Sequence, residues 1–537
     1  LYTQVKKEIK DLLKAEEPDG TLPASFLTSP LEPVVFDSDF IVQKFSTGLE
    51  FPTTMYFVGD DILVLEKSSG KVIRVSDNGI HYNEPVLDVP VDACWESGFL
   101  GISGISNHVF LYFSESESGS DTTKLHDQPM KNIVYRYDWN GEKLINPILI
   151  KELPGNLDGG HRHNGGAMTN QNNQIYFVIG DLTQFGIFQN IISSVNIMET
   201  SSIFKVDTEN NNVELFAMGI RNSFGLAVDP VTGFLWDTEN GDRFYDEINL
   251  VKPGFNSGWK MVMGPVDRIN LDTCEYLNEL DIHSCLEWII ASTNTPQTIP
   301  PPFENFEYSD PEFSWWETVG LTAIEFPDKD GFGKYSDWLF VADFNNGKIY
   351  KFQLNSDRTG FVFSNPDLSD LVLDDNDKID EILFASGFQG VIDIKFHDGA
   401  MYVVSIGDGS IYKIYPPEPL SPLKQYQSGV THKKIVCKPS LMPIMSKSGS
   451  IYCVYPKTAI TLNNVLDRSI EHPEMPKIKL RGQNLQGLNF EHLNLSNSDF
   501  HNANFYTAKI SNVNFTRVNL SNINLSDKDL TGTILKG

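Results

Sequence analysis

The chain has 537 residues, of which 42 are Lys or Arg and 71 are Asp or Glu, so its formal net charge is −29 at pH 7. Such a length is too great for one core and predicts a large domain with smaller accessory parts. The negative charge argues against a nucleic-acid partner, because phosphates would be repelled. No stretch approaches the roughly 18 apolar residues that a membrane-spanning helix needs, so we expect a protein that does not span a membrane.

An amphipathic helix is predicted near the N-terminus, between Tyr2 and Ala15. Its apolar face would hold Val5, Ile9, Leu12 and Leu13. Residues 1–40 as a whole are predicted to form this helix and an extended lead-in that contains prolines. Because the chain begins at Leu1 and not at Met, a removed signal peptide and an arbitrary boundary are equally open.

Between residues 41 and 416 a strand pattern recurs. Six segments share one form of strand ending: Val72–Val75, Val134–Tyr137, Ile203–Val206, Ile248–Val251, Ile349–Phe352 and Ile411–Ile414. Three of them follow an apolar run and a Gly-containing turn, as in DILVLEKSSGKVIRV, which is typical of a β-hairpin. Six such hairpins at intervals of about 45 to 100 residues predict an all-β fold, a six-bladed β-propeller.

An insertion is predicted at residues 263–314, between the fourth and fifth blades. It contains Cys274 and Cys285, which are close enough in sequence to form a disulfide, and the proline run Pro300–Pro302. An insertion at this point would lie on a loop face, where it could shape access to a substrate.

Residues 417–476, which follow the propeller, are predicted to form a small linker. Cys437 and Cys453 bracket a short stretch rich in Lys, Ser, Pro and Gly, of the kind that a disulfide staples. Cys94 would then be a small buried hydrophobe, and the alternative is that all five cysteines are reduced. Because disulfides persist outside the cytosol, the cysteines favour an extracellular or cell-surface location.

From residue 477 to 537 an apolar residue occupies every fifth position. The twelve centres are Leu480, Leu485, Phe490, Leu495, Phe500, Phe505, Ile510, Phe515, Leu520, Leu525, Leu530 and Leu535. A period of five fits neither a helix nor a strand. Units such as NLQGL and NFEHL resemble the pentapeptide-repeat family, whose chain winds as a right-handed quadrilateral β-helix. The resemblance implies a rigid stacked surface that could bind a protein partner or a second copy.

Four segments of the propeller carry residues that a plain propeller does not require. They are Cys94–Ile102, Gly159–Gly166 (GGHRHNGG), Met218–Leu226 (MGIRNSFGL) and Trp236–Trp259, which contains WDTENGDRFYDEINL. In order and spacing they resemble the soluble quinoprotein glucose/sorbosone dehydrogenase family. The resemblance implies a six-bladed propeller that holds pyrroloquinoline quinone (PQQ) and calcium over its central channel. It also implies oxidation of an aldose hydroxyl, with electrons passed to an external acceptor.

The resemblance assigns roles to individual residues. His163 stands where the family has its general base, a task that suits an imidazole because its unperturbed pKa lies near neutrality. Arg221 and Asn222 match a pair that contacts the quinone, and the guanidinium of Arg221 would stabilise negative charge on the quinone oxygens. Trp316 matches an aromatic residue that stacks against the quinone. Glu96 stands where the family often has Gln.

An acidic segment indicates calcium chemistry. Glu239, Asp242, Asp246 and Glu247 lie within nine residues and offer hard oxygen ligands, which favour Ca²⁺ over transition metals. By the resemblance, the backbone carbonyls of Gly241 and Asp242 would contact the calcium of the cofactor, and Glu247 a structural calcium. Glu239 is a further candidate ligand.

Several positions differ from the pattern of the family. Asn345, a candidate cofactor contact, stands where the family has a Lys, and residues 389–394 (QGVIDI) replace a stretch that usually offers two arginines. Ala167 replaces a frequent Arg, and Asp242 stands at a common Pro. PQQ carries three carboxylates, so each lost cation would weaken its binding by about 1 kcal/mol or more.

Two functions remain open at this point. The first is a PQQ-dependent dehydrogenase acting on a sugar, which His163, Arg221, Asn222 and Trp316 favour. The second is a non-catalytic calcium-binding propeller used for extracellular recognition or surface assembly, which the missing cations favour. A third reading, a hydrolase with a calcium-bound site, explains the carboxylates but not the HNGG and RN motifs.

Overall fold

The computed structural model describes two compact units, Leu1–Pro416 and Pro417–Gly537. In the first unit the structure describes residues 32–416 without 124–130, 156–160, 184–198, 243, 260–261, 267–305, 329–330 and 375–376. In the second unit it describes residues 417, 425, 435, 437, 441–445, 451–461, 478 and 480–536. The predicted N-terminal helix, Cys274, Cys285 and most of the predicted insertion lie outside these residues.

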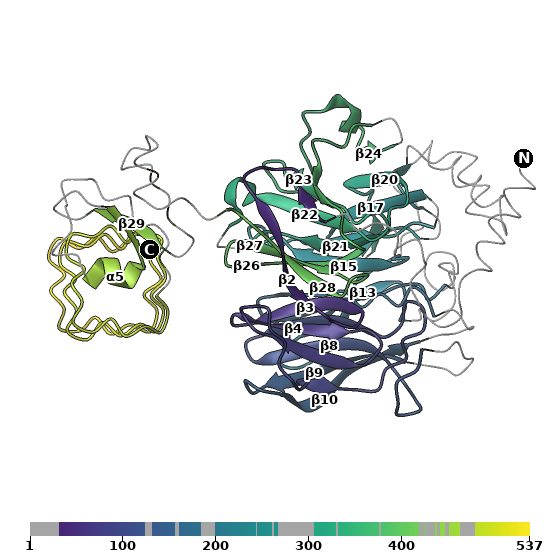
Figure 1. The fold of residues 1–537 in the computed structure, drawn as a ribbon, viewed down its shortest axis with the longest axis horizontal. Coiled ribbons are helices and arrows are strands. Elements are labelled where there is room, and N and C mark those ends of the chain that lie inside the picture. Colours follow the sequence, from purple (N-terminus) through teal and green to yellow (C-terminus); the bar gives the residue numbers. More distant parts are fainter. Residues whose placement is uncertain are drawn as a thin grey trace, which may run out of the picture. The chain divides into compact units, whose positions relative to one another are not determined.

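Six sheets of four to six strands make up the described part of the first unit (Figure 1). The first sheet holds β3 (Pro52–Val58), β4 (Asp61–Glu66), β5 (Lys71–Val75) and β6 (Leu87–Asp88). The second holds β7 (Phe99–Ile105), β8 (His108–Glu115), β9 (Lys131–Trp139) and β10 (Leu144–Pro154). The third holds β11 (Met168–Gln171), β12 (Gln174–Ile179), β13 (Ser202–Asp207), β14 (Val213–Met218), β18 (Phe255–Asn256) and β19 (Glu307–Tyr308).

The other three sheets follow in chain order. The fourth holds β15 (Ser223–Val228), β16 (Leu235–Glu239), β17 (Phe244–Val251), β20 (Phe313–Glu317) and β24 (Val372–Leu373). The fifth holds β21 (Leu321–Glu325), β22 (Trp338–Asp343), β23 (Ile349–Gln353), β25 (Leu383–Ser386) and β1 (Val34–Val35). The sixth holds β26 (Val391–His397), β27 (Ala400–Ser405), β28 (Ser410–Tyr415) and β2 (Ile41–Thr47). The short 3₁₀ helices η5 (Gly333–Tyr335) and η6 (Pro366–Leu368) lie in connections.

The sheets follow one another in a ring. In each sheet the first three consecutive strands pair antiparallel, and the first strand packs beside the first strand of the next sheet. This order runs from β3 through β7, β11, β15, β21 and β26, and β26 contacts β3 again. Strand β2, from the start of the unit, pairs with β28 from its end and so closes the ring. The predicted all-β, propeller-like arrangement is confirmed.

The recurring strand endings of the sequence have one structural meaning. All six lie in the third strand of a sheet, namely in β5, β9, β13, β17, β23 and β28. Each third strand pairs with the second strand beside it, as when Val72 lies opposite Leu65. The repeat therefore marks one structural unit per sheet.

Apolar layers lie between neighbouring sheets and hold the ring together. In β4 all of Ile62–Leu65 is buried, which a sheet with a solvated face would not allow. Leu63 and Leu65 join a core shared with the second sheet, whereas Ile62 and Val64 join a core shared with the sixth sheet. Successive strand residues point to opposite faces, so a continuous apolar run serves both layers.

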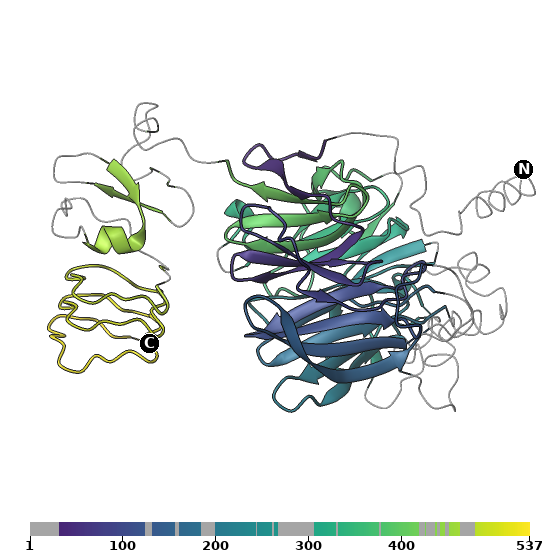
Figure 2. The same cartoon turned by 60° about the horizontal axis from the view of Figure 1, so that its bottom comes forward.

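The second unit is built from stacked coils (Figures 1 and 2). Parallel bridges join residues twenty positions apart, such as Asn484 with Asn504 and Asn494 with Asn514, so one coil takes four pentapeptides. The apolar centres from Leu485 to Phe515 are buried in a common core. Corner residues recur every five positions with positive φ, and Asn or Gly often occupies them because these residues tolerate that conformation.

The start of the second unit packs against the coils. Strands β29 (Met442–Met445) and β30 (Ile451–Val454) form a hairpin, and helix α5 (Pro456–Thr461) follows it. Ile444, Ala459 and Ile460 belong to the same apolar core as the coils. The predicted disulfide between Cys437 and Cys453 is present, with a Cα–Cα distance of 5.6 Å. It ties this small module together beside the first coil.

Candidate functional site

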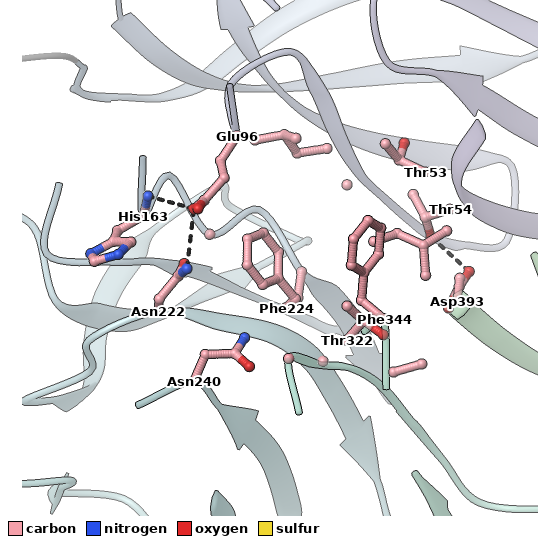
Figure 3. A pocket seen from close by; sticks show the side chains of 18 of the residues that line it. Thr53, Thr54, Glu96, His163, Asn222, Phe224, Asn240, Thr322, Phe344 and Asp393 are labelled. Atoms are coloured by element: carbon pink, nitrogen blue, oxygen red, sulfur yellow. Dashed lines mark hydrogen bonds between the residues drawn. The ribbon is translucent and has the colours of Figure 1, made fainter. Parts of the chain in front are cut away.

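A pocket of about 510 Å³ lies at the centre of the ring. The first strand of every sheet contributes to its lining: Thr53 and Thr54 from β3, Gly101 from β7, Met168 from β11, Phe224 from β15, Thr322 from β21 and Asp393 from β26. Figure 3 shows side chains from several of these strands facing one cavity. The pocket therefore lies on the axis around which the sheets are arranged.

The structure brings most of the predicted site residues into this pocket. Those that line it are Glu96, His163, Arg221, Asn222, Gly241, Asp242 and Asn345. Trp316, Glu239 and Glu247 are absent from the lining. The pocket thus contains both proposed catalytic residues and most of the proposed cofactor contacts.

His163 is held by a buried carboxylate. Its Nδ1 lies 2.6 Å from Oδ1 of Asp181, whose side chain is only 1% exposed. Asp181 also accepts hydrogen bonds from Nε1 of Trp259 and from the backbone N–H of Thr183. Burial acts to raise the pKa of Asp181, but the hydrogen bonds from His163 and Trp259 and the charge of Arg221 outweigh it and hold that pKa below its ordinary value. In the neutral ring, a proton on Nδ1 leaves Nε2 as an acceptor.

The backbone around His163 is in an unusual conformation. His163 has a φ of 57°, in the left-handed region, and Gly165 and Gly166 have φ values of 65° and 100°. A non-glycine residue in this region costs about 1–3 kcal/mol and persists where its surroundings enforce it. A Cβ at Gly180 would lie 2.4 Å from the carbonyl oxygen of His163, so the neighbouring strand must present a glycine there.

Glu96 connects the HNGG and RN motifs. Its Oε2 accepts a hydrogen bond of 2.7 Å from the backbone N–H of His163 and one of 3.1 Å from Nδ2 of Asn222 (Figure 3). Oδ1 of Asn222 is buried and has no hydrogen-bond partner among the described residues. Glu96 therefore fixes both groups while leaving an acceptor of Asn222 available to a ligand.

Arg221 is already engaged by the acidic segment. Its Nη2 lies 3.1 Å from Oδ1 of Asp242, and its Nη1 donates to the backbone carbonyl of Asn240 at 2.8 Å. The guanidinium also lies over the ring of Trp259, 5.2 Å from its centroid. Much of the positive charge of Arg221 is thus balanced by Asp242, the residue that stands at a common Pro of the family.

The carboxylates of the acidic segment lie in different places. Asp246 accepts hydrogen bonds from the backbone N–H groups of Gly241, Val319 and Gly320, and so shapes the pocket wall. Burial raises the pKa of Asp246 to about 6 against the effect of these donors.

Glu239 and Glu247 lie beneath the wall of the pocket. They are cross-strand partners in β16 and β17, and both are buried. Glu239 accepts hydrogen bonds from the backbone N–H of Arg221 and from the hydroxyl of Ser257. Burial raises the pKa of Glu239 to about 7, and burial together with the charge of Glu239 raises the pKa of Glu247 well above its ordinary value.

The described side chains of this segment do not form a metal site. In the described part of the chain no three His, Cys, Asp or Glu side chains are placed to hold one ion. The available oxygens at the pocket are of another kind. Oδ1 of Asn240 is buried without a hydrogen-bond partner in the described structure, beside the backbone of Gly241 and Asp242. Amide and carbonyl oxygens of this kind suit Ca²⁺.

Trp316 is not among the residues that line the pocket. Its ring stacks on Phe244 at 4.6 Å and meets the edge of Tyr245 at 5.1 Å, outside the pocket lining. That it stacks against a ligand in this pocket stays a prediction. Phe224 and Phe344 instead present rings to the cavity (Figure 3). Phe344 adjoins Asn345 and Phe224 lies two positions after Asn222, so their place beside predicted residues is a signal that could have found them.

Sequence reasoning also missed part of the charge of the pocket. Among the described residues, four cations line it, Lys67, Arg162, Arg221 and Lys395, together with four carboxylates, Glu96, Asp242, Asp246 and Asp393. Lys395 forms ion pairs with Glu325 at 2.8 Å and with Asp393 at 3.3 Å. Arg162 lies over the ring of Trp95, 4.2 Å from its centroid. The lining is therefore close to neutral despite the acidity of the whole chain.

Comparison with known proteins agrees with this geometry. Residues 49–268 match the family model Glucose / Sorbosone dehydrogenase. Within this range the first unit is similar to these dehydrogenases. Residues 478–512 and 508–537 match the Pentapeptide repeats model. Both resemblances predicted from the motifs are confirmed.

The match to two curated relatives extends over most of the length of each relative. Quinoprotein glucose dehydrogenase B of Acinetobacter calcoaceticus is 23% identical over 399 residues, 62% of this chain and 82% of that protein. Aldose sugar dehydrogenase YliI of Escherichia coli is 20% identical over 339 residues, 59% of this chain and 81% of that protein. The chain is therefore similar to these two sugar dehydrogenases over most of their length.

Solved structures agree in fold. The soluble aldose sugar dehydrogenase of Escherichia coli in its apo form superposes with a TM-score of 0.51 at 15% identity, covering 70% of this chain and 99% of that one. An oxidoreductase of the glucose dehydrogenase type from Thermus thermophilus gives 0.50 at 20% identity over the same shares. In the described residues no helix is long and apolar enough to cross a membrane.

Proposed function

We propose that the first unit is a PQQ-dependent dehydrogenase that oxidises a hydroxyl group of an aldose and passes the electrons to an external acceptor. The observation that carries the proposal is the pair of His163 and Asp181 at a pocket that also contains Arg221 and Asn222. The names of the two curated relatives support the substrate class.

The residues at one end of the pocket fit the quinone of PQQ. Buried Oδ1 of Asn222 and Nε of Arg221 have no hydrogen-bond partner in the described structure, and both residues line the cavity. Bound PQQ would supply a quinone that accepts a hydride. His163 would take the hydroxyl proton at Nε2, while Asp181 holds Nδ1–H and stabilises the positive charge of the ring. Arg221 and Asn222 would orient the cofactor.

Calcium is proposed as a second ligand of the same pocket. Candidate donors are the backbone carbonyls of Gly241 and Asp242 and the free amide oxygen of Asn240. Such oxygens are ligands that Ca²⁺ prefers. A second calcium at Glu247 and Glu239 would offset the free-energy cost of burying two charged carboxylates. This is the physical reason to keep the second calcium in the proposal.

The finer description of the fold belongs to the same proposal. We infer that each of the six sheets is one blade of the propeller, which the ring of first strands and the closure by β2 support. We also infer that the coils of the second unit form a right-handed quadrilateral β-helix, which the twenty-residue spacing of the parallel bridges supports.

A binding function without catalysis is the alternative. It is favoured by the charge balance of the pocket, because Arg221 and Lys395 are already paired with carboxylates and Asn345 supplies no cation. A calcium-stabilised propeller with this pocket could recognise a carbohydrate and take part in an extracellular assembly.

Two measurements distinguish the dehydrogenase from the binding propeller. PQQ is titrated into calcium-loaded protein, and dye reduction is then measured with a panel of aldoses. The test variant is His163→Ala, and the control is His397→Ala on β26, which lies outside the pocket lining. Binding with turnover that only His163→Ala abolishes would establish the dehydrogenase. Failure to bind PQQ at micromolar concentration would leave the recognition propeller.

The location and the role of the second unit are proposals of their own. We expect an extracellular or cell-surface protein, because the disulfide of Cys437 and Cys453 needs an oxidising compartment to persist. We also propose that the coils dock a protein partner or a second copy. Fractionation of the source cells and light scattering of the full chain test these two points.

A further inference from the structure

Lys67 occupies a fixed position at the pocket. It follows β4, and its backbone N–H donates to the carbonyl of Phe51 at 3.0 Å, while its own carbonyl accepts from the N–H of Phe99 at 3.0 Å. A Cβ at Gly98 would lie 3.0 Å from Cγ of Lys67, so the side chain runs closely past this glycine. The backbone is thus tied on both sides, and the side chain lines the cavity.

The ammonium group of Lys67 differs from the charged groups of Arg221 and Lys395, two other cations of the pocket. Its Nζ donates to the neutral carbonyl of Ala93 at 3.2 Å, and it has no carboxylate within 4.0 Å among the described residues. Arg221 and Lys395, in contrast, each form an ion pair. Lys67 is half-buried, and an amine that is partly removed from water without a counter-ion is costly to keep charged.

The pKa of Lys67 reflects this cost. Burial lowers the pKa of Lys67 to about 8, while the charges of Cys94, Glu96 and Asp92 oppose the shift. Neither carboxylate, of Glu96 or of Asp92, lies within ion-pair distance of Nζ in the described structure. An anion that entered the pocket beside Lys67 would gain a charge-assisted hydrogen bond and would stabilise the ammonium form.

We propose that Lys67 binds a carboxylate group of the ligand in this pocket. The inference deepens the proposed function, since PQQ carries three carboxylates and the cations expected at Asn345 and at residues 389–394 are missing from the sequence. Lys67 lies directly after β4 in the first sheet, far in sequence from Asn345 and from residues 389–394. It would therefore provide, from the first sheet, a positive charge in place of the cations that the family pattern has in the fifth and sixth sheets.

The test compares ligands that differ only in the carboxylates. PQQ and its trimethyl ester are titrated into calcium-loaded protein, with binding followed by intrinsic fluorescence and by calorimetry. The variants are Lys67→Met, Lys67→Arg and the control Lys71→Met, which changes a lysine on the neighbouring strand β5 outside the pocket lining. Thermal unfolding of each variant shows whether it is folded.

Loss of one charge-assisted hydrogen bond should weaken PQQ binding by about tenfold or more in Lys67→Met. Binding of the trimethyl ester should change by less than about twofold, Lys67→Arg should recover much of the affinity, and Lys71→Met should bind as the wild type does. Equal losses for PQQ and for its ester, or unchanged PQQ binding in Lys67→Met, would overturn the assignment.

A further arm separates this inference from the cofactor proposal. If the wild-type protein binds no PQQ, the cofactor proposal fails, and gluconate, a carboxylate without a quinone, is used as the probe. Gluconate binding that Lys67→Met removes would still support Lys67 as the carboxylate-binding residue. Absence of binding for both probes would overturn the inference. Should Lys67→Met not fold, protection of Lys67 from reductive methylation by the same probes, read by mass spectrometry, decides in the same way.

Discussion

The replacement Asp181→Asn tests the core of the site. The carboxylate of Asp181 accepts three hydrogen bonds, from Nδ1 of His163 at 2.6 Å, from the N–H of Thr183 at 2.9 Å and from Nε1 of Trp259 at 2.6 Å. An asparagine has one oxygen and one NH₂ group, so it cannot accept from both sides. With its oxygen toward His163, the NH₂ group faces the indole N–H. With its oxygen toward Trp259, the NH₂ group faces the N–H of Thr183 and Nδ1 of His163. Nδ1 must then accept a hydrogen bond, so the proton of the neutral ring moves to Nε2.

The size of the effect follows from this geometry. Either orientation leaves at least one buried donor without an acceptor, which costs about 1–3 kcal/mol of stability. In the second orientation Nε2 of His163 carries the proton and cannot act as a base. A general base contributes roughly 10²–10⁴-fold to a rate, so turnover of the PQQ-loaded protein should fall by that order.

Two measurements check this expectation. Nitrogen NMR of the imidazoles reports the tautomer of His163 without any cofactor, and dye reduction reports turnover. The matched control is Asp343→Asn, another buried carboxylate, whose partner Tyr350 has a hydroxyl that can reverse its role as donor. Turnover within threefold of the wild type for Asp181→Asn, with its stability unchanged, would refute the reasoning.

Three further predictions concern stability. Burial raises the pKa of Asp343 from 3.8 to about 6, so its favourable contribution is present below pH 4 and is lost as the pH rises through 6; relative to Asp343→Asn, the wild type should lose up to about 3 kcal/mol over this window in urea unfolding. Replacement of Cys437 and Cys453 by Ser opens a loop with a sequence separation of 16 and should cost the second unit about 3 kcal/mol, measured by hydrogen exchange in the full chain. Phe490→Ala removes a ring that is 0% exposed and should cost about 3–5 kcal/mol, seen as faster exchange of the coil amides.

The repeated parts of the fold were predictable because each repeat meets the same physical demand. The apolar residue at every fifth position of the coils must be buried in each unit, so the period appears in the sequence without interruption. The strand endings recur because the third strand of each sheet packs between two neighbouring layers. His163, Arg221 and Asn222 could be found for a different reason, namely the local motifs that contain them.

The rest of the site depends on contacts that no short motif encodes. Trp316 has the expected sequence context, yet its ring packs on Phe244, because β20 pairs beside β17 and brings the two rings together. Lys67 and Lys395 belong to sheets at opposite ends of the unit's sequence, and only the closed ring places both at one cavity. Sequence spacing cannot reveal such a meeting, since it depends on how six sheets converge.

The charge of the pocket links the departures from the family pattern to one another. Asp242 adds a carboxylate that pairs with Arg221, and Asp393 adds one that pairs with Lys395, so two cations that could hold an anionic ligand are balanced from within. A pocket arranged in this way binds a polyanion more tightly if a further cation is not yet paired. Among the four cations of the lining, Lys67 has a carbonyl as its partner and no carboxylate within ion-pair distance in the described structure. If Lys67 binds a carboxylate as we propose, this amine supplies part of the charge that several cations supply in the pattern of the family.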